Sequence, residues 1–174
     1  MSIENQPGDR FPLVPIMSSI AYLEISPRQA GKTTRLVHRA RDLTENNQRV
    51  CFVTLKGMKR EVQRALPRAL VLADGEPFPP GENPAASVWF YDEFDWLQSA
   101  IWRPGAYYAT SPRFIRRPDE TPTKPDLLLD LVKRNGYRFE RHYWPWDMEE
   151  VLREGRALHS AEEFRRLYLG EFLE

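Results

Sequence analysis

The chain of 174 residues contains one cysteine, Cys51, which excludes an internal disulfide framework and a zinc cluster of thiolates. It contains no apolar run near the roughly 20 residues that a membrane helix needs. Its first residues lack the basic stretch and apolar run of a secretory signal. The 25 basic and 25 acidic residues cancel, so net charge gives no argument for nucleic-acid binding. We therefore expect a soluble protein of a reducing compartment.

The composition nevertheless supports a folded domain. Hydrophobic residues make up 41% of the chain, which is enough for a core, and the length suits one domain. Pro7, Pro12 and Pro15 interrupt regular structure near the start of the chain. We expect an irregular segment over residues 1–19 and a single domain over residues 20–174.

Strands and helices are predicted to alternate along the chain. Short apolar or β-branched runs predict strands at 20–25, 49–55, 69–73, 88–91, 107–110 and 137–143. Helical spacing and capping residues predict helices at 33–43, 59–66 and 93–101, from Thr123 to Gly136, from Asp147 to Gly155, and at 160–168. This alternation predicts an α/β fold, with a mainly parallel sheet flanked by helices.

A phosphate-binding loop follows the first predicted strand and opens the first helix. Its candidate nucleotide-binding residues are Ser26, Pro27, Arg28, Gln29, Ala30, Gly31, Lys32, Thr33 and Thr34. The pattern G-x-x-x-x-G-K-[ST] is matched except that Ser26 replaces the first glycine. Backbone N–H groups of residues 29–34 can surround a phosphate at the helix N-terminus, where the helix dipole favours anions. Lys32 would contact the β- and γ-phosphates of ATP, and the Thr33 hydroxyl would bind Mg²⁺.

Two adjacent acids end the strand Val88-Trp-Phe-Tyr-Asp-Glu93. Ligands of open parallel sheets bind at the carboxyl ends of the strands. Asp92 would hold Mg²⁺, directly or through water, and Glu93 would act as the general base toward the attacking water. Asp95 is a weaker competitor for either role. The alternative is a solvated helix start, but the phosphate-binding loop some 60 residues earlier favours the catalytic interpretation.

These elements resemble the ATPase domain of the large terminase subunit of tailed bacteriophages, the motor that packages DNA into procapsids. The loop S-P-R-Q-A-G-K-T is similar to terminase loops, which often replace the first glycine and carry an arginine at the position of Arg28. The acid pair is similar to the family's metal-binding aspartate and catalytic glutamate. The sequence Tyr108-Ala-Thr-Ser-Pro112 resembles the family's coupling motif. Residues 160–172 resemble the segment that closes the ATPase domain.

The resemblance covers about residues 20–174 and implies a RecA-like phosphate-loop ATPase of the catalytic-glutamate class that uses ATP and Mg²⁺. It implies catalytic roles for Glu93, Lys32 and Arg28. It also implies that Thr110 and Ser111 report the γ-phosphate to a DNA-contacting loop. The implied partners are double-stranded DNA, the phage portal and procapsid, and further copies of the chain in a homo-oligomeric ring. The implied location is the cytoplasm of the bacterial host.

The nuclease domain of the family has no counterpart in these residues, so we expect no nuclease activity. Arg113 and Arg116, in the basic loop over residues 103–117, are candidates for an arginine supplied in trans or for a DNA contact. Solvated surface is the alternative for both. Three other functions stay open: another DNA-translocating or phage-assembly ATPase, a small-molecule kinase, and a nucleotide-binding module without turnover. The adjacent Asp92 and Glu93 favour hydrolysis over a kinase reaction.

Overall fold

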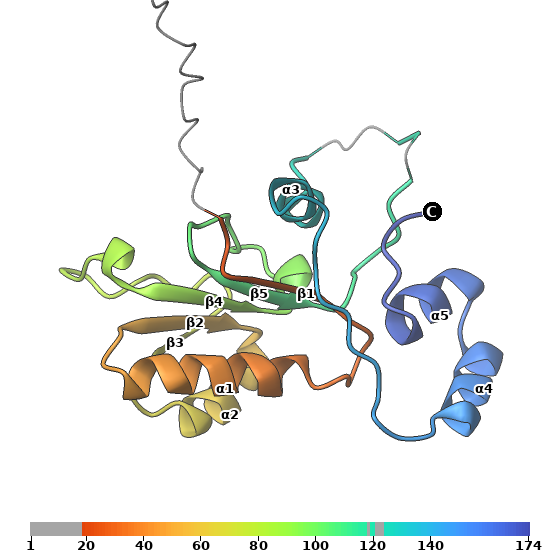
Figure 1. Cartoon of the computed structure of the whole chain (residues 1–174), viewed down its shortest axis with the longest axis horizontal. Coiled ribbons are helices and arrows are strands. Elements are labelled where there is room, and N and C mark those ends of the chain that lie inside the picture. The colour runs from red at the N-terminus through yellow and green to blue at the C-terminus, as the bar shows by residue number, and fades with distance from the viewer. Residues whose placement is uncertain (1–18, 118, 121–123) are drawn as a thin grey trace, which may run out of the picture.

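The structure is a computed structural model that describes residues 19–117, 119–120 and 124–174. In these residues one parallel sheet forms the centre of the fold (Figure 1). The strands are β1 (Tyr22–Ile25), β2 (Val50–Thr54), β3 (Leu70–Ala73), β4 (Val88–Asp92) and β5 (Tyr107–Thr110). Their order is β1-β5-β4-β2-β3, and every pairing is parallel. The predicted α/β fold with a parallel sheet is confirmed.

Helices α1 (Lys32–Glu45) and α2 (Lys59–Ala65) lie on one face of this sheet, and α3 (Leu127–Arg134) lies on the other (Figure 1). Helices α4 (Glu149–Leu158) and α5 (Ala161–Tyr168) lie beside the sheet. On one face, Leu36 of α1 packs in a buried cluster with Phe52 and Phe90. On the other face, Leu128 of α3 belongs to a second cluster that includes Tyr108. Because both faces are covered, the strands are apolar along nearly their whole length.

The strand order decides which residues meet at the carboxyl edge. Strand β5 lies between β1 and β4, with Ile25 of β1 in register with Thr110 and Asp92 of β4 in register with Ala109. The chain leaves β1 into the segment that begins at Ser26. The predicted phosphate-binding loop, the acid pair and the hydroxyl residues of β5 therefore lie at one edge of the sheet.

The helix predicted over 93–101 is wrong. Only a 3₁₀ turn, η3 (Phe94–Trp96), forms there. Residue Glu93 has a left-handed backbone conformation, with φ of 56°, which no residue inside an α-helix adopts. Further along, the backbone N–H groups of Gln98 and Ser99 donate to the Asp74 carboxylate instead of to a preceding turn. These longer-range contacts outweigh the local helical pattern.

The sixth strand, predicted over 137–143, is also wrong. One isolated parallel bridge joins Glu140 to Glu24 of β1. The backbone at Tyr137 is left-handed, with φ of 60°, and the N–H of His142 donates to the Ser26 hydroxyl. The segment therefore touches the free edge of β1 at one point and then turns toward the phosphate-binding loop.

The helix caps follow the sequence in part. The capping box at Ser160 is confirmed at the start of α5. The cap of α3 is Asp126, whose side chain accepts from the Leu129 N–H, and the predicted cap at Thr123 lies outside the described residues. In helix α4 the N-cap position is Met148, which makes no side-chain cap, and the predicted Asp147 side chain accepts from the Glu149 N–H at 2.9 Å; the helix continues to Leu158, beyond the predicted end near Gly155.

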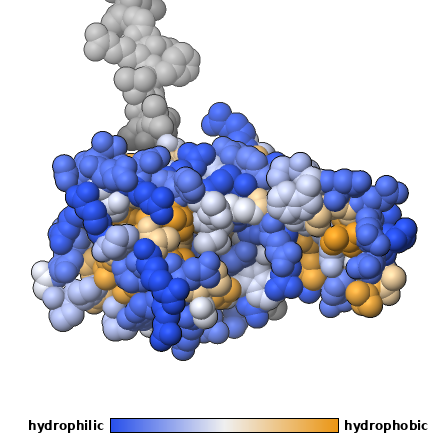
Figure 2. All heavy atoms as spheres, turned by 90° about the horizontal axis from the view of Figure 1, so that it is seen from below, coloured by the Kyte–Doolittle hydropathy of each residue, from blue (hydrophilic) through white to orange (hydrophobic). Residues whose placement is uncertain are grey.

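The predicted irregular segment 1–19 lies, except for residue 19, outside the described residues. None of the helices in the described part of the chain is long and apolar enough to cross a membrane. Seen from the side of α1 and α2, the surface is largely hydrophilic with hydrophobic patches (Figure 2). One patch lies at the end of the molecule where α4 sits, and Val151 and Leu158 of that helix are 41% and 79% exposed.

Candidate functional site

The loop between β1 and α1 presents a row of backbone donors. Gly31, the N-cap of α1, has φ of 82°, and Gln29 has φ of 56°. Among the described residues, none of the backbone N–H groups of residues 29–34 donates a hydrogen bond. Left-handed residues in such a loop turn successive N–H groups toward one centre, which is the geometry of an anion site at a helix N-terminus. The loop therefore fits a phosphate group.

Lys32 lies inside this loop rather than in solvent. Its side chain is 3% exposed, and its ammonium group donates to the Pro27 carbonyl oxygen at 2.7 Å. The Lys32 Nζ atom is also 3.3 Å from Glu93 Oε1. The cationic group is therefore buried between the loop backbone and the acid pair, where a phosphate bound in the loop would meet it.

Asp92 is buried at the end of β4 and is 1% exposed. Its carboxylate accepts from the Thr33 hydroxyl at 3.0 Å and from the Thr54 hydroxyl at 3.2 Å. Burial and the nearby charge of Glu93 raise the pKa of Asp92 to about 7. A divalent cation beside Thr33 and Asp92 would favour the ionised carboxylate.

The oxygen atoms of Thr33 and Asp92 fit a Mg²⁺ ion that is bound together with a nucleotide. The described residues contain no group of three or more histidine, cysteine, aspartate or glutamate side chains that could hold a metal by itself. Mg²⁺ in nucleotide sites is typically bound through one or two protein oxygens, with phosphate and water oxygens completing the shell. The Thr33 hydroxyl and the Asp92 carboxylate, in contact with each other, supply two such oxygens.

Glu93 turns out of the strand toward β5. Its Oε2 atom accepts from the N–H and from the hydroxyl of Ser111, both at 2.8 Å, and the Thr110 hydroxyl is 3.4 Å away. A left-handed backbone at a non-glycine residue costs on the order of 1–2 kcal/mol, and such strain is concentrated at functional sites. The two acids therefore have different partners: Asp92 accepts from the Thr33 and Thr54 hydroxyls, whereas Glu93 accepts from Ser111 and lies beside the Lys32 ammonium group.

The segment around α5 packs directly on the loop. The Arg28 N–H donates to the Leu167 carbonyl oxygen at 2.8 Å, and the Trp144 indole donates to the Arg28 carbonyl oxygen at 3.1 Å. The Arg28 side chain is exposed at the mouth of a cavity of about 450 Å³, which Glu93 and Tyr168 also line. The cavity thus joins the loop, the acid pair and the C-terminal helices.

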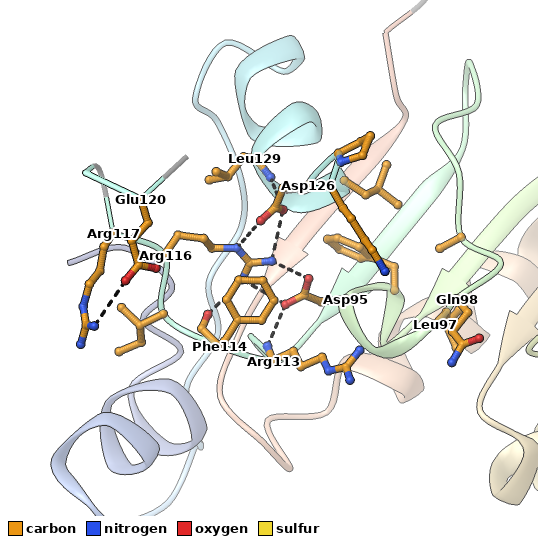
Figure 3. Close-up of a pocket in the computed structure, with 16 residues that line it drawn as sticks. Asp95, Leu97, Gln98, Arg113, Phe114, Arg116, Arg117, Glu120, Asp126 and Leu129 are labelled. Atoms are coloured by element: carbon orange, nitrogen blue, oxygen red, sulfur yellow. Dashed lines mark hydrogen bonds and ion pairs between the residues drawn. The ribbon is translucent and has the colours of Figure 1, made fainter. Parts of the chain in front are cut away.

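Arg113 and Arg116 are in different environments. Arg116 is 6% exposed, and its guanidinium group lies between the carboxylates of Asp95 and Asp126 (Figure 3). Both carboxylates are nearly buried, so withdrawing the guanidinium would leave them without this partner, at a cost of about 3–5 kcal/mol. Arg116 is therefore an internal ion-pair residue in this structure. Arg113 is exposed and remains the candidate for a contact with a neighbouring molecule.

Sequence reasoning missed an ion pair next to the loop, in which the buried Glu24 binds Arg35, whose side chain is 30% exposed. Glu24 is fully buried in β1 and accepts from the Ser26 hydroxyl at 2.7 Å and from Arg35 Nε at 3.0 Å. Burial by itself would raise the pKa of Glu24, but the hydrogen bonds from Arg35 and Ser26 outweigh it and hold that pKa below its usual value. The available signal was a single carboxylate within a buried parallel strand, where a charge needs a partner.

The structure brings most of the predicted site residues together. Those with described contacts to the loop or the acid pair are Ser26, Pro27, Arg28, Lys32, Thr33, Asp92, Glu93, Thr110 and Ser111. Comparison of the chain with protein-family models, with curated proteins and with solved structures finds no match.

Proposed function

We propose that the chain is a Mg²⁺-dependent ATPase with a phosphate-binding loop of the catalytic-glutamate class. One observation carries this proposal: the unpaired N–H groups of residues 29–34 and the buried Lys32 ammonium lie at the same sheet edge as Asp92 and Glu93. A chance G-K-T at the start of a helix gives no reason for the buried Asp92 and the partly exposed Glu93 to lie at the same point.

The residues of the site divide into three roles. The loop N–H groups and Lys32 hold the phosphates of ATP, and Thr33 and Asp92 hold Mg²⁺, which when bound neutralises charge on the phosphates. Glu93 accepts a hydrogen bond from the attacking water and orients it, since its carboxylate is aimed by Ser111 rather than left free in solvent.

The translocation of double-stranded DNA into a viral procapsid is proposed from the terminase resemblance. That resemblance is supported by two contacts: Ser111 of the coupling motif binds Glu93, and the closing segment around Leu167 binds the loop at Arg28. A homo-oligomeric ring on the phage portal, in the cytoplasm of the bacterial host, is the proposed working form. Another DNA-translocating or phage-assembly ATPase would use the same site.

A small-molecule kinase is the second candidate. The cavity of about 450 Å³ beside Arg28 and Glu93 favours it, because an acceptor could lie there next to the terminal phosphate. A kinase would hydrolyse ATP slowly without its acceptor, and its rate would not respond to duplex DNA. The DNA response of ATP turnover therefore separates the two functions.

The roles of Lys32 and Glu93 can be tested by two substitutions. We expect Lys32→Ala to weaken ATP binding roughly 10- to 100-fold, because it removes charged hydrogen bonds to the phosphates. We expect Glu93→Gln to keep ATP affinity while lowering the turnover number on the order of 10²–10⁴-fold. Binding is measured with fluorescent ATP, and turnover by phosphate release with and without duplex DNA and procapsids.

The matched controls are Lys59→Ala and Glu76→Gln, which break a surface ion pair of 2.6 Å between α2 and the turn after β3. Neither control should change ATP binding or turnover. Equal loss of ATP affinity in Lys32→Ala and Glu93→Gln would contradict the assigned roles. Turnover that persists in Glu93→Gln would exclude Glu93 as the base.

A further inference from the structure

The peptide unit between Ala30 and Gly31 is bound by an arginine side chain from α1. Arg35, one turn into α1, donates from Nη2 to the Ala30 carbonyl oxygen at 2.6 Å. In a trans peptide unit the carbonyl oxygen and the following N–H point in opposite directions. Fixing the Ala30 carbonyl toward α1 therefore turns the Gly31 N–H away from Arg35, to the open side of the loop.

Arg35 is itself fixed by a buried carboxylate. Glu24 accepts from Arg35 Nε at 3.0 Å and from Arg35 Nη2 at 2.5 Å, so the pair is bidentate. The other contacts of the Glu24 carboxylate come from the Tyr22 and Ser26 hydroxyls, at 2.8 and 2.7 Å. The alternation of side chains along β1 directs Glu24 to the face that α1 covers, since Tyr22 belongs to that core cluster.

Contact between Arg35 and the loop is close at Gly31 as well. A Cβ atom built on Gly31 would lie 3.0 Å from Arg35 Nη1. The guanidinium group therefore packs against the backbone of the glycine whose left-handed conformation starts α1. Arg35 therefore contacts the loop at two consecutive residues, Ala30 and Gly31.

We propose that Arg35, anchored by Glu24, is a positioning residue that keeps the Ala30–Gly31 peptide turned so that the Gly31 N–H faces a bound polyphosphate. This inference rests on the proposed function, because it concerns the phosphate site of the same loop. A loop without this support must be ordered by the ligand, which reduces affinity. The effect belongs to phosphate binding and not to the step that Glu93 performs.

The test is the double variant Glu24→Gln with Arg35→Met, compared with each single variant and with the wild-type chain. Arg35→Met alone leaves a buried carboxylate unpaired and should lower the melting temperature. The double variant removes one charge of each sign, so the net charge near the loop is unchanged and the melting temperature should recover. Binding of tripolyphosphate and of ATP is measured by calorimetry for each protein.

We expect the double variant to bind tripolyphosphate roughly tenfold more weakly than the wild-type chain, which is the loss of about one charged hydrogen bond. The KM for ATP should rise by a similar factor, with kcat little changed. Wild-type affinity for tripolyphosphate in a double variant that melts normally would overturn the proposal. Absence of ATP and tripolyphosphate binding by the wild-type chain would instead refute the proposed function, and this inference with it.

A second variant keeps the test decisive when the double variant does not fold. Arg35→Lys retains a cation for Glu24, but a single ammonium group lacks the fork that reaches both Glu24 and the Ala30 carbonyl. It should lower tripolyphosphate affinity to a similar extent. Its matched control is Arg39→Lys, one turn further along α1 on an exposed side chain, which should have no effect. Equal affinities of Arg35→Lys and the wild-type chain would overturn the proposal.

Discussion

Replacing Asp92 by asparagine should stabilise the ligand-free protein while abolishing the proposed Mg²⁺-dependent ATP hydrolysis. Asparagine has nearly the same shape and keeps an oxygen that can accept from the Thr33 and Thr54 hydroxyls, which lie 3.0 and 3.2 Å from the carboxylate. It removes a carboxylate that is 1% exposed and close to the charge of Glu93. Function and stability therefore oppose each other at this position.

The sign of the effect follows from the raised pKa of Asp92. This pKa is about 7 in the folded protein and near 3.8 in the unfolded chain. Between these values the folded state binds the additional proton, so the free energy of unfolding decreases as pH rises. Below pH 3.8 the group has no effect, and above pH 7 its destabilising effect is complete.

The magnitude follows from the same two values. One pKa unit corresponds to about 1.4 kcal/mol, so ionised Asp92 lowers the free energy of unfolding by about 4 kcal/mol at pH 8. At pH 5 the same group lowers it by only roughly 1–2 kcal/mol. The advantage of Asp92→Asn over the wild-type chain should therefore shrink by more than half between pH 8 and pH 5.

The assay is urea denaturation of both proteins from pH 5 to pH 8, without nucleotide and with a metal chelator. Comparing the difference between the two proteins cancels the titration of all other groups. Asp42→Asn, at an exposed position of α1, is the matched control and should not alter the pH dependence. A difference in stability between Asp92→Asn and the wild-type chain that stays constant over this pH range would show that the pKa of Asp92 is not raised by folding.

Two further predictions concern coupling and assembly. Ser111→Ala removes one of the two 2.8 Å hydrogen bonds to Glu93 Oε2. It should lower DNA-stimulated ATP hydrolysis roughly tenfold and basal ATP hydrolysis by a smaller factor. Equal losses of the two rates would contradict a coupling role. Mixtures of Arg113→Ala and Glu93→Gln subunits should regain ATPase activity that neither variant has alone, because the Glu93→Gln subunit offers an intact arginine to its neighbour. Mixed rings that stay inactive would leave Arg113 as surface or as a DNA contact.

The sequence by itself predicted the features that depend on neighbouring residues. Apolar runs located all five strands, and helical spacing located α1 and α2 to within about two residues. The loop around Gly31 and the acid pair at the end of β4 could be singled out as candidates because nucleotide chemistry needs residues at fixed short spacings. The capping box at Ser160 is likewise a pattern of four residues. The steric and hydrogen-bonding preferences of neighbouring residues are sufficient to predict each of these local features.

Contacts between distant residues were decided only by the tertiary structure. Thr33 meets Asp92 across 59 residues of sequence, and Glu93 meets Ser111 across 18. No periodicity encodes the strand order that places β5 between β1 and β4, or the left-handed backbone at Glu93 that replaced a predicted helix.

The partners of the buried charged residues were likewise not predictable from the sequence. Arg116 looked like a surface arginine in a basic loop, yet it is enclosed by two carboxylates from separate segments. Glu24 and Arg35 carried no recognised motif, although Arg35 binds both Glu24 and the Ala30 carbonyl oxygen of the loop after β1. A charged residue is stable in the interior only with a partner, and the identity of that partner is set by how the elements pack.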